Sequence, residues 1–441
     1  MERYLIRGGN VLRGETAVSG AKNIAAKALV AATLTSEEVT IKNIPLISDF
    51  LVVVEIIKEL GGNVTLHDHT AVVSVPQFKR SIVSFEKAAE TRTSTMLIAP
   101  LLARTGKAVV PNPGGCRIGV RPIERTIDGL KKLGAEITYD SEDGYFHATT
   151  KKLVGATYRF SKNTHTGTET LILAAVLADG KTILQNAAAE PEVDELIALL
   201  NEMGAQIKRT DPHTIEIQGV PQLHGATFTI LPDKNEIVTF AVAALLTNGD
   251  ILVKDAQKAH IQEFLHEVQR AGGGYEKGEQ GIRFFAKDTL SPTHITTGIY
   301  PGFMTDWQSP WAVLMTKANG TSTIHETVYE YRFGYVSELL KMGAKIQLYN
   351  PEVTNPQEVY NFNLTDDKPQ FFHAARIIGP TSLHNAAVTI SDLRAGATLV
   401  LASLAANGES VVHGIHHLKR GYEKFAERLT TLGAEITYIQ E

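Results

Sequence analysis

The only cysteine of this 441-residue chain, Cys116, lies in a segment whose composition favours chemistry. Two glycines precede it and one follows closely, so the backbone can bend and approach a ligand. The neighbouring Arg117 and Arg121 would favour a thiolate or attract an anion. An isolated cysteine is more commonly an inert, buried residue. The glycine-rich, arginine-flanked setting instead predicts an exposed thiol beside a negatively charged substrate.

Six copies of one structural unit must position this segment. Each copy has a short β-branched strand, a loop, a helical pattern that ends at a glycine, and a second strand. The glycine is predicted to be the helix C-cap, which permits the left-handed turn into the next strand. Stretches 171–178, 240–246 and 399–406 are apolar on nearly every side, which predicts helices buried inside a domain. The repeat glycines are Gly61, Gly134, Gly204, Gly272, Gly343 and Gly433.

Three of the six copies carry an arginine at an equivalent place, in the loop just before the repeat helix. These residues are Arg121, Arg332 and Arg420. A solvated surface charge is the ordinary interpretation of any one of them. Three at equivalent positions predict convergence on an anion, which the planar guanidinium binds well. The last repeat interval is longer than the others, which predicts an inserted surface excursion near 349–372.

Composition limits the class of protein. The chain has a hydrophobic fraction of 43%, a charged fraction of 21% and a net charge of −5, as expected of a soluble globular protein of two or more domains. This charge argues against a surface that wraps nucleic acid. No signal-peptide pattern or bilayer-length apolar run is found, so no membrane insertion is expected. A single cysteine fits a reducing cytoplasm.

Seven short motifs follow one another over almost the whole chain. They are SGAKN (19–23), PGGC (113–116), LPD (231–233), PGFMTD (301–306), EYRF (330–333), SDLRA (391–395) and RGYE (420–423). Any one could occur by chance. In this order, spacing and repeat frame, they make the chain resemble the enolpyruvyl transferases.

The resemblance implies an α/β fold, a two-domain inside-out α/β barrel with three repeats per domain. Its helices would be buried and its sheets would lie outside. One domain would span 22–231 and carry the Cys116 loop. The other would combine 1–21 with 232–441 and carry the insertion near 349–372. The active site of such proteins is the cleft between the domains, which closes over substrate.

The resemblance also implies a reaction. The enolpyruvyl group of phosphoenolpyruvate would pass to the 3′-hydroxyl of UDP-N-acetylglucosamine with release of phosphate, the first committed step of peptidoglycan synthesis. Phosphoenolpyruvate carries a phosphate and a carboxylate, so its site needs several fixed cations. By the resemblance, Lys22, Arg121 and Arg420 would hold the phosphate, and Arg332 and Arg394 the carboxylate.

Two residues would move protons in this reaction. Asp306 matches the group beside the acceptor hydroxyl, whose proton a carboxylate there could accept. The alternative is a turn or helix-capping aspartate. Cys116 matches the family's proton donor, which can also form a covalent adduct with phosphoenolpyruvate. The ordinary thiol pKa of about 8.5 leaves such a group mostly protonated at neutral pH yet able to ionise.

Other positions match substrate contacts of the family. Asn23 and Arg92 match residues that contact substrate, and Val328 corresponds to a contact with the nucleotide sugar. Two loops match those around the uridine nucleotide. Besides Arg121, these loops contain Pro122, Ile123, Glu124, Arg125, Lys162, Asn163, Thr164 and His165.

Three residues depart from the family pattern. Arg117 replaces a small residue after the cysteine, and its charge should lower the thiol pKa. Thr126 stands where histidine is typical, and Thr166 replaces a glycine beside the second nucleotide loop. Both bear on the identity of the acceptor.

Two other functions stay open. A 5-enolpyruvylshikimate-3-phosphate synthase would share the fold and the donor, but that enzyme lacks the loop cysteine. A non-catalytic paralogue that binds nucleotide sugar would not need the whole set of ionisable residues. No metal or cofactor is expected, because pairs such as His67/His69 and His416/His417 lack further ligands at metal spacing.

Overall fold

The computed structural model describes residues 2–112, 119–287 and 289–440, and it forms two compact units. Among these residues, unit 1 consists of 2–19, 119–121, 232–287 and 289–440, and unit 2 of 20–112 and 122–231. Six sheets are found among the described residues, three in each unit. Five of them contain four strands in the same arrangement, in which the second strand pairs in parallel with the first and antiparallel with the third. One of these five sheets has an additional short strand at its edge, parallel to the first.

Unit 2 contains three of the sheets. One has the order β13 (Ala226–Thr229), β3 (Val39–Lys42), β5 (Thr70–Ser74), β4 (Asn63–His67). Another has the order β9 (Thr157–Arg159), β10 (Lys181–Gln185), β12 (Thr214–Gln218), β11 (Gln206–Asp211). The third is β6 (Lys107–Pro111), β8 (Tyr145–Thr149), β7 (Glu136–Asp140). In this third sheet a parallel bridge between Ile82 and Val109 takes the place of the first strand.

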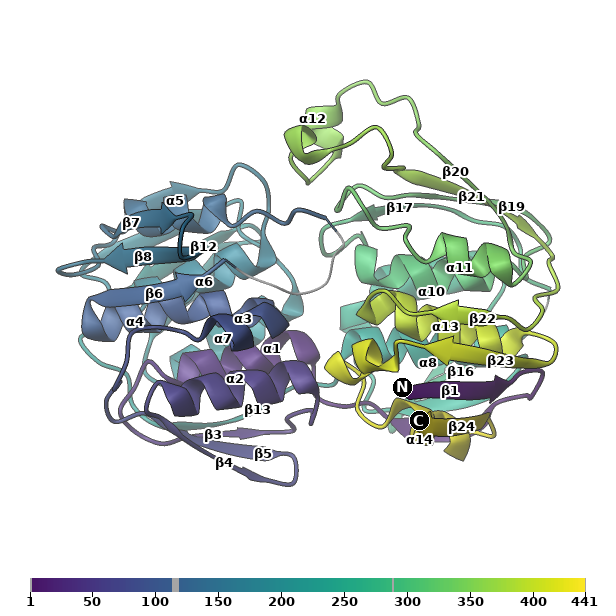
Figure 1. Ribbon diagram of the computed structural model, residues 1–441, viewed down its shortest axis with the longest axis horizontal. Helices are drawn as coiled ribbons and strands as arrows, with labels where there is room; N and C mark the ends of the chain where they lie inside the picture. Colours follow the sequence, from purple (N-terminus) through teal and green to yellow (C-terminus); the bar gives the residue numbers. More distant parts are fainter. Residues whose placement is uncertain (1, 113–118, 288, 441) are drawn as a thin grey trace. The chain divides into compact units, whose positions relative to one another are not determined.

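Unit 1 contains the other three. The first has the strand order β2 (Arg13–Ala17), β14 (Asp250–Lys254), β16 (Gly281–Phe285), β15 (Gly274–Lys277). The second has the order β18 (Phe303–Met304), β17 (His294–Gly298), β19 (Gly320–His325), β21 (Ala374–Gly379), β20 (Lys345–Tyr349). The third has the order β22 (Ala387–Thr389), β23 (Glu409–His413), β1 (Glu2–Arg7), β24 (Glu435–Gln440). The N-terminal strand therefore completes the sheet of the last repeat, between β23 and β24 (Figure 1).

Six helices lie in the interiors of the units. They are α1 (Lys22–Ala32), α4 (Ile98–Thr105) and α6 (His165–Ala175) in unit 2, and α8 (Lys234–Leu246), α10 (Thr305–Met315) and α13 (Leu393–Ala405) in unit 1. The three helices predicted to be buried are confirmed as parts of α6, α8 and α13. In unit 1, α8, α10 and α13 contact one another, with strands on either side of them (Figure 1). Helices inside and sheets outside are the inside-out α/β arrangement that the resemblance implies.

The repeat glycines confirm the predicted helix ends. The outer helices are α2 (Ser48–Glu59), α5 (Glu124–Lys132), α7 (Pro191–Glu202), α9 (Gln262–Arg270), α11 (Val336–Lys341) and α14 (Phe425–Thr431). Each is followed by its repeat glycine, and all six glycines have φ between 84° and 105°. Only glycine adopts this backbone conformation readily, so the turn into the next strand requires it.

The remaining short elements lie between these. They are α3 (Phe85–Glu90), η1 (Arg92–Leu97), η2 (Lys258–Ile261) and η4 (Ile415–Arg420), with α12 (Pro356–Val359) and η3 (Leu364–Asp366) in the long connection from β20 to β21. That connection, 350–373, stands at the end of β20 and β21 in Figure 1 and corresponds to the predicted excursion. Among the described residues, no helix is long and apolar enough to cross a membrane.

Residues 119–121 belong to a different unit from the one that the expected domain boundaries give them. The expected domain 22–231 includes Arg121, whereas the compact units assign Gly119, Val120 and Arg121 to unit 1. The Val120 backbone N–H donates to the Glu330 carboxylate, and the Arg121 guanidinium lies 5.7 Å from the Tyr329 ring centre. These contacts account for the grouping.

Candidate active site

The candidate active site is built around Asp306, at the start of the buried helix α10. Asp306 lies in the first turn of α10, where the positive end of the helix dipole favours a carboxylate. The strand β18 leads directly into this helix and fixes its beginning. Most of the helix is apolar and buried, so the polar residues of its first turn are held at the edge of the core.

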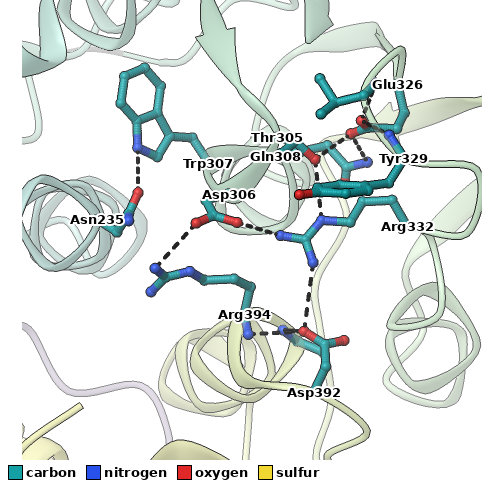
Figure 2. Close-up of polar contacts among 12 residues, drawn as sticks. Asn235, Thr305, Asp306, Trp307, Gln308, Glu326, Tyr329, Arg332, Asp392 and Arg394 are labelled. Carbon is teal, nitrogen blue, oxygen red and sulfur yellow. Dashed lines mark hydrogen bonds and ion pairs between the residues drawn. The ribbon is translucent and has the colours of Figure 1, made fainter. Parts of the chain in front are cut away.

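Two arginines from different elements bind the Asp306 carboxylate (Figure 2). Arg332 Nη2 donates to Oδ1 at 2.8 Å, and Arg394 Nη2 donates to Oδ2 at 3.3 Å. Both arginines are buried, with 7% and 4% of their surface exposed. Each carboxylate oxygen therefore has its own buried guanidinium, while 23% of the Asp306 side-chain surface stays exposed.

This pairing sets the protonation state of Asp306. Burial on its own would raise the pKa of the carboxyl, but the charges of Arg394 and Arg332 lower it to about 2. A carboxylate with so low a pKa accepts protons poorly at neutral pH. As long as both arginines hold it, Asp306 is an anionic ligand for them.

Arg332 is held in place by a second carboxylate, that of Glu326. The Thr305 hydroxyl accepts from Arg332 Nε at 3.2 Å and donates to Glu326 Oε2 at 2.9 Å. Glu326 also accepts from the backbone N–H groups of Val328 and Tyr329, at 2.8 and 3.1 Å. It is fully buried, and burial raises the pKa of its carboxyl. Glu326 thus ties the backbone beside Val328 to the first turn of α10.

Arg394 is positioned by the start of α13. The Asp392 side chain caps this helix by accepting from the backbone N–H of Arg394 at 3.0 Å, and it lies 3.8 Å from Arg332 Nη1. Arg394 Nη1 also donates to the Tyr422 hydroxyl at 3.1 Å. The motifs SDLRA and RGYE therefore meet at this arginine, although they are far apart in the sequence.

The other cationic residues implied by the resemblance lie as follows. Lys22 begins α1 in unit 2, and its ammonium lies 2.9 Å from the Asp49 carboxylate. Arg420 ends η4 in unit 1 and is half-buried. Its charge contributes to lowering the pKa of the nearby His417. Cys116 lies outside the described residues, and so does Arg117.

Unit 2 contains a small hollow, with a cavity volume of about 20 Å³, whose wall brings together several residues of the expected nucleotide loops. The first turns of α5 and α6 both contribute to its wall. Helix N-termini present free N–H groups and favour anions. Of the sequence-predicted contacts, those lining it are Arg92, Pro122, Ile123 and Thr164; Thr126 and Thr166 line it as well.

Sequence reasoning missed the six other residues of this hollow, which are Thr95, Ile98, Val110, Ile127, Gly167 and Thr170. Gly167 permits close packing of two helix starts, because a Cβ there would lie 2.5 Å from the Thr164 methyl and 3.1 Å from the Thr126 hydroxyl. One signal in the sequence could have pointed to this part of the hollow. Thr126, which departs from the family pattern, lies in the same wall as Gly167.

A buried ionic cluster stands behind the second nucleotide loop. The Lys27 ammonium lies 2.5 Å from Glu169 Oε2, and His165 Nε2 lies 3.1 Å from Glu169 Oε1. Glu169 is fully buried. Burial alone would lower the pKa of His165, but the Glu169 carboxylate raises it overall. The cluster anchors His165 at the first residue of α6, next to the hollow.

The remaining predicted contacts have mixed roles. The buried Asn163 donates to the Ala187 carbonyl at 2.9 Å, which is a structural tie of its loop. The Arg125 carbonyl accepts from the Tyr158 hydroxyl at 2.8 Å. Glu124 is exposed, whereas Asn23 and Lys162 are half-buried.

Two clusters of described residues have the ligand types of a metal site. Asp140, Asp143 and His147 form one, and Glu263, His266 and Glu267 the other. The first is on an exposed hairpin, where Asp143 already pairs with His147 at 2.8 Å. In the second, Glu267 pairs with Arg270 at 2.7 Å. Neither cluster includes a residue of the sequence-predicted site.

The family model and two relatives that match this chain are all carboxyvinyltransferases by description. Residues 6–429 match the family model described as EPSP synthase (3-phosphoshikimate 1-carboxyvinyltransferase). The chain is 40% identical to a UDP-N-acetylglucosamine 1-carboxyvinyltransferase of Koribacter versatilis, covering 100% of this chain and 97% of that protein. It is 41% identical to the protein of the same name from Acidobacterium capsulatum, over 99% of this chain and 96% of the other.

Solved structures share the fold. The enolpyruvyl transferase NikO from Streptomyces tendae superposes with a TM-score of 0.87 at 25% identity, covering 100% of this chain and 99% of the other. EPSP synthase from Acinetobacter baumannii has a TM-score of 0.74 at 16% identity, with both chains fully covered. The second likeness concerns the fold alone.

Proposed function

Because the chain belongs to the EPSP synthase family and is an enolpyruvyl transferase, we propose that it transfers the enolpyruvyl group of phosphoenolpyruvate to the 3′-hydroxyl of UDP-N-acetylglucosamine. Phosphate is the other product. The observation that carries the proposal is the pair of buried arginines that shares one carboxylate, Asp306. The reaction would begin peptidoglycan synthesis, and thereby support cell-wall formation, cell shape and division, in the cytoplasm.

The arginine pair suits the donor carboxylate. Arg332 and Arg394 already bind a carboxylate, one guanidinium to each oxygen. A planar substrate carboxylate presents the same two oxygens in the same geometry. We assign these two residues to the carboxylate of phosphoenolpyruvate, and Lys22, Arg121 and Arg420 to its phosphate.

Binding of the donor would also create the base. As the substrate carboxylate takes over the two guanidinium groups, Asp306 loses the contacts that lower its pKa. Its pKa then rises towards the range in which a carboxylate accepts a proton. The donor thus frees the group that removes the proton from the acceptor hydroxyl.

The proposed transfer then takes place in two steps, an addition and an elimination. In the addition, the acceptor oxygen bonds to the substituted carbon of the enol while Asp306 takes the hydroxyl proton and Cys116 gives a proton to the methylene carbon. In the elimination, a proton leaves the resulting methyl group, the double bond re-forms, and phosphate departs with the electrons of its C–O bond. The thiolate of Cys116 is the natural acceptor of that proton, which would regenerate the thiol.

The hollow of unit 2 suits a nucleotide diphosphate. Its wall includes two helix starts, the Arg92 side chain and several threonine hydroxyls. Such groups donate hydrogen bonds to phosphate oxygens. We assign the UDP part of the acceptor to this hollow. Val328 stays an expected contact of the nucleotide sugar, as the resemblance implies.

The runner-up is a synthase that uses shikimate 3-phosphate as acceptor. The family model bears its description, but the lone cysteine of the loop argues against it. A non-catalytic paralogue is disfavoured because Asp306, Arg332 and Arg394 form an intact and costly buried network.

Phosphate release distinguishes these functions. The purified protein is mixed with phosphoenolpyruvate and, in parallel, with UDP-N-acetylglucosamine, shikimate 3-phosphate or UMP. Rapid release only with UDP-N-acetylglucosamine is expected, together with an enolpyruvyl ether on its 3′-oxygen. Release with another acceptor alone would overturn the acceptor assignment. No release with any acceptor, from protein whose tryptophan fluorescence shows it folded, would favour the paralogue.

A further inference from the structure

The excursion 350–373 has a core of its own. Tyr360 and Phe362 stack with ring centres 4.9 Å apart, and His373 lies 5.1 Å from each ring. These three residues are at most 6% exposed. The His373 imidazole also lies 3.0 Å from the Asp367 carboxylate. A connection of this length is usually mobile, but this one is a small folded element.

The excursion is packed against the segment that carries site residues. We call residues 326–332 the substrate loop; it lies between the end of β19 at His325 and the start of α11 at Val336. The His373 carbonyl accepts from the Glu326 backbone N–H at 2.7 Å, and the Asn361 backbone N–H donates to the Thr327 carbonyl at 2.7 Å. At the far end of the loop, the rings of Tyr331 and Phe371 lie 4.9 Å apart.

The substrate loop is therefore held from two sides. On its inner side, the Glu326 carboxylate binds the N–H groups of Val328 and Tyr329 and is tied through Thr305 to Arg332 (Figure 2). On the other side, the excursion binds the backbone at 326 and 327 and the ring at 331. The loop has no helix or strand of its own, so its conformation depends on such contacts. Thr327 adds two more, because its backbone N–H donates to the Thr297 hydroxyl at 2.9 Å and its hydroxyl donates to the Thr297 carbonyl at 2.7 Å.

We propose that the excursion 350–373 is a positioning element for the substrate loop, which it holds in the conformation that binds nucleotide sugar and donor carboxylate. The proposal rests on the proposed function. If the excursion is lost, only a fraction of molecules has the loop in place, and apparent affinity falls by that fraction. Once both substrates are bound, they themselves hold the loop, so turnover at saturation is largely preserved.

The strand register allows a clean excision. Tyr349 and Ala374 are directly paired across β20 and β21. Replacing 350–373 with Asn-Gly therefore joins the strands by a two-residue hairpin turn without changing their register. Phe371→Ala is the milder variant, and Tyr331→Phe, which keeps the ring contact, is compared with Tyr331→Ala. Glu358→Ala, on the exposed side of α12, is the matched control.

Steady-state kinetics give the main readout. The excision should raise KM for UDP-N-acetylglucosamine about tenfold, which corresponds to about 1.4 kcal/mol, and change kcat by less than about threefold. Phe371→Ala and Tyr331→Ala should raise KM about threefold, and Tyr331→Phe should raise it less than Tyr331→Ala does, because it keeps the ring contact. Glu358→Ala, outside the substrate loop, should match the original protein. Unchanged KM in both the excision and Phe371→Ala would overturn the proposal, as would a loss of kcat at unchanged KM.

Hydrogen exchange separates this proposal from the proposed function. The amides of Val328 and Tyr329 should exchange faster in the excision variant and in Phe371→Ala, whatever the reaction. Equal protection in all variants would overturn the positioning role even if the enzyme were active. If the original protein released no phosphate, the proposed function would fail, and the exchange rates would still decide whether the excursion holds the loop. If the excision variant does not fold, Phe371→Ala decides alone.

Discussion

Replacing Asp306 by asparagine should cost stability in a pH-dependent way. The pKa of Asp306 falls from an ordinary 3.8 to about 2 in the folded protein. This difference corresponds to roughly 2–3 kcal/mol of stability at neutral pH. Because the folded pKa is lowered, the contribution is present above pH 4 and is lost as the pH falls towards 2. At pH 3 about half of it should remain. The asparagine side chain has the same shape without the charge, so the variant lacks this contribution at every pH.

Tryptophan fluorescence is a selective assay for this prediction. The chain has two tryptophans, Trp307 and Trp311, and both are buried in α10, the helix that carries Asp306. Urea unfolding followed by their emission therefore reports on unit 1, and urea leaves the ion pairs unscreened. Asp250→Asn is the matched control, since the Asp250 carboxylate accepts from Arg283 at 2.8 Å and the side chains of this pair are 36% and 47% exposed. An exposed pair should contribute less than about 1 kcal/mol.

Two results of the unfolding experiment would contradict this account of the Asp306 ion pairs. If Asp306→Asn and Asp250→Asn cost the same at pH 7, burial between two arginines does not strengthen the pair. If the cost of Asp306→Asn is as large at pH 3 as at pH 7, the loss comes from packing and not from the charge. Phosphate release by Asp306→Asn should fall by about 10²–10⁴ in kcat, as expected for loss of a general base.

Three further predictions follow from other parts of the molecule. Cys116→Ser should abolish or sharply reduce phosphate release, whereas Cys116→Asp should keep some, because a carboxylic acid can also deliver a proton; full activity of the serine variant would remove the thiol from the mechanism. Lys27→Met should leave the buried Glu169 carboxylate with only the His165 imidazole as its partner and destabilise unit 2 by about 2–4 kcal/mol. Lys152→Met, in the exposed pair with Asp179, should cost under about 1 kcal/mol. Equal shifts in urea unfolding monitored by circular dichroism would contradict this. Thr166→Val keeps the shape of the hollow but removes a hydroxyl, and should raise KM for UDP-N-acetylglucosamine about fivefold with KM for phosphoenolpyruvate unchanged; a change in both would place Thr166 elsewhere in the mechanism.

The repeat architecture could be predicted because its signals are local. A glycine after an amphipathic helix needs only its own backbone conformation, and all six repeat glycines have it. The helices that are apolar on every side are buried because no face of theirs suits water. By contrast, nothing in the first ten residues indicates that β1 pairs with β23 and β24, since that pairing joins the two ends of the chain.

Candidate residues of the site could be identified from motifs, but the contacts among them could not. Arg332, Arg394 and Asp306 were each identified from motifs that resemble a family. That the arginines bind Asp306 itself depends on how α10, α13 and the substrate loop pack, which no single motif encodes. Glu326 was missed because it looks like the polar end of a strand, although its burial makes it the anchor of the substrate loop.

The contacts of Arg332 and Arg394 with carboxylates bear on which anions the proposed donor site would bind. Convergent arginines suggest a positive trap for any anion, but here Arg332 and Arg394 face Asp306 and Asp392, so their charge is already balanced. A chloride or another spherical anion gains little by entering, because it cannot replace both oxygens of Asp306 at once. A planar carboxylate can, and only such a ligand releases Asp306 from both guanidinium groups. Selectivity for the donor and activation of the base would then arise from one exchange of carboxylates, which also explains why so low a pKa for Asp306 in the unliganded site is compatible with a role in proton transfer.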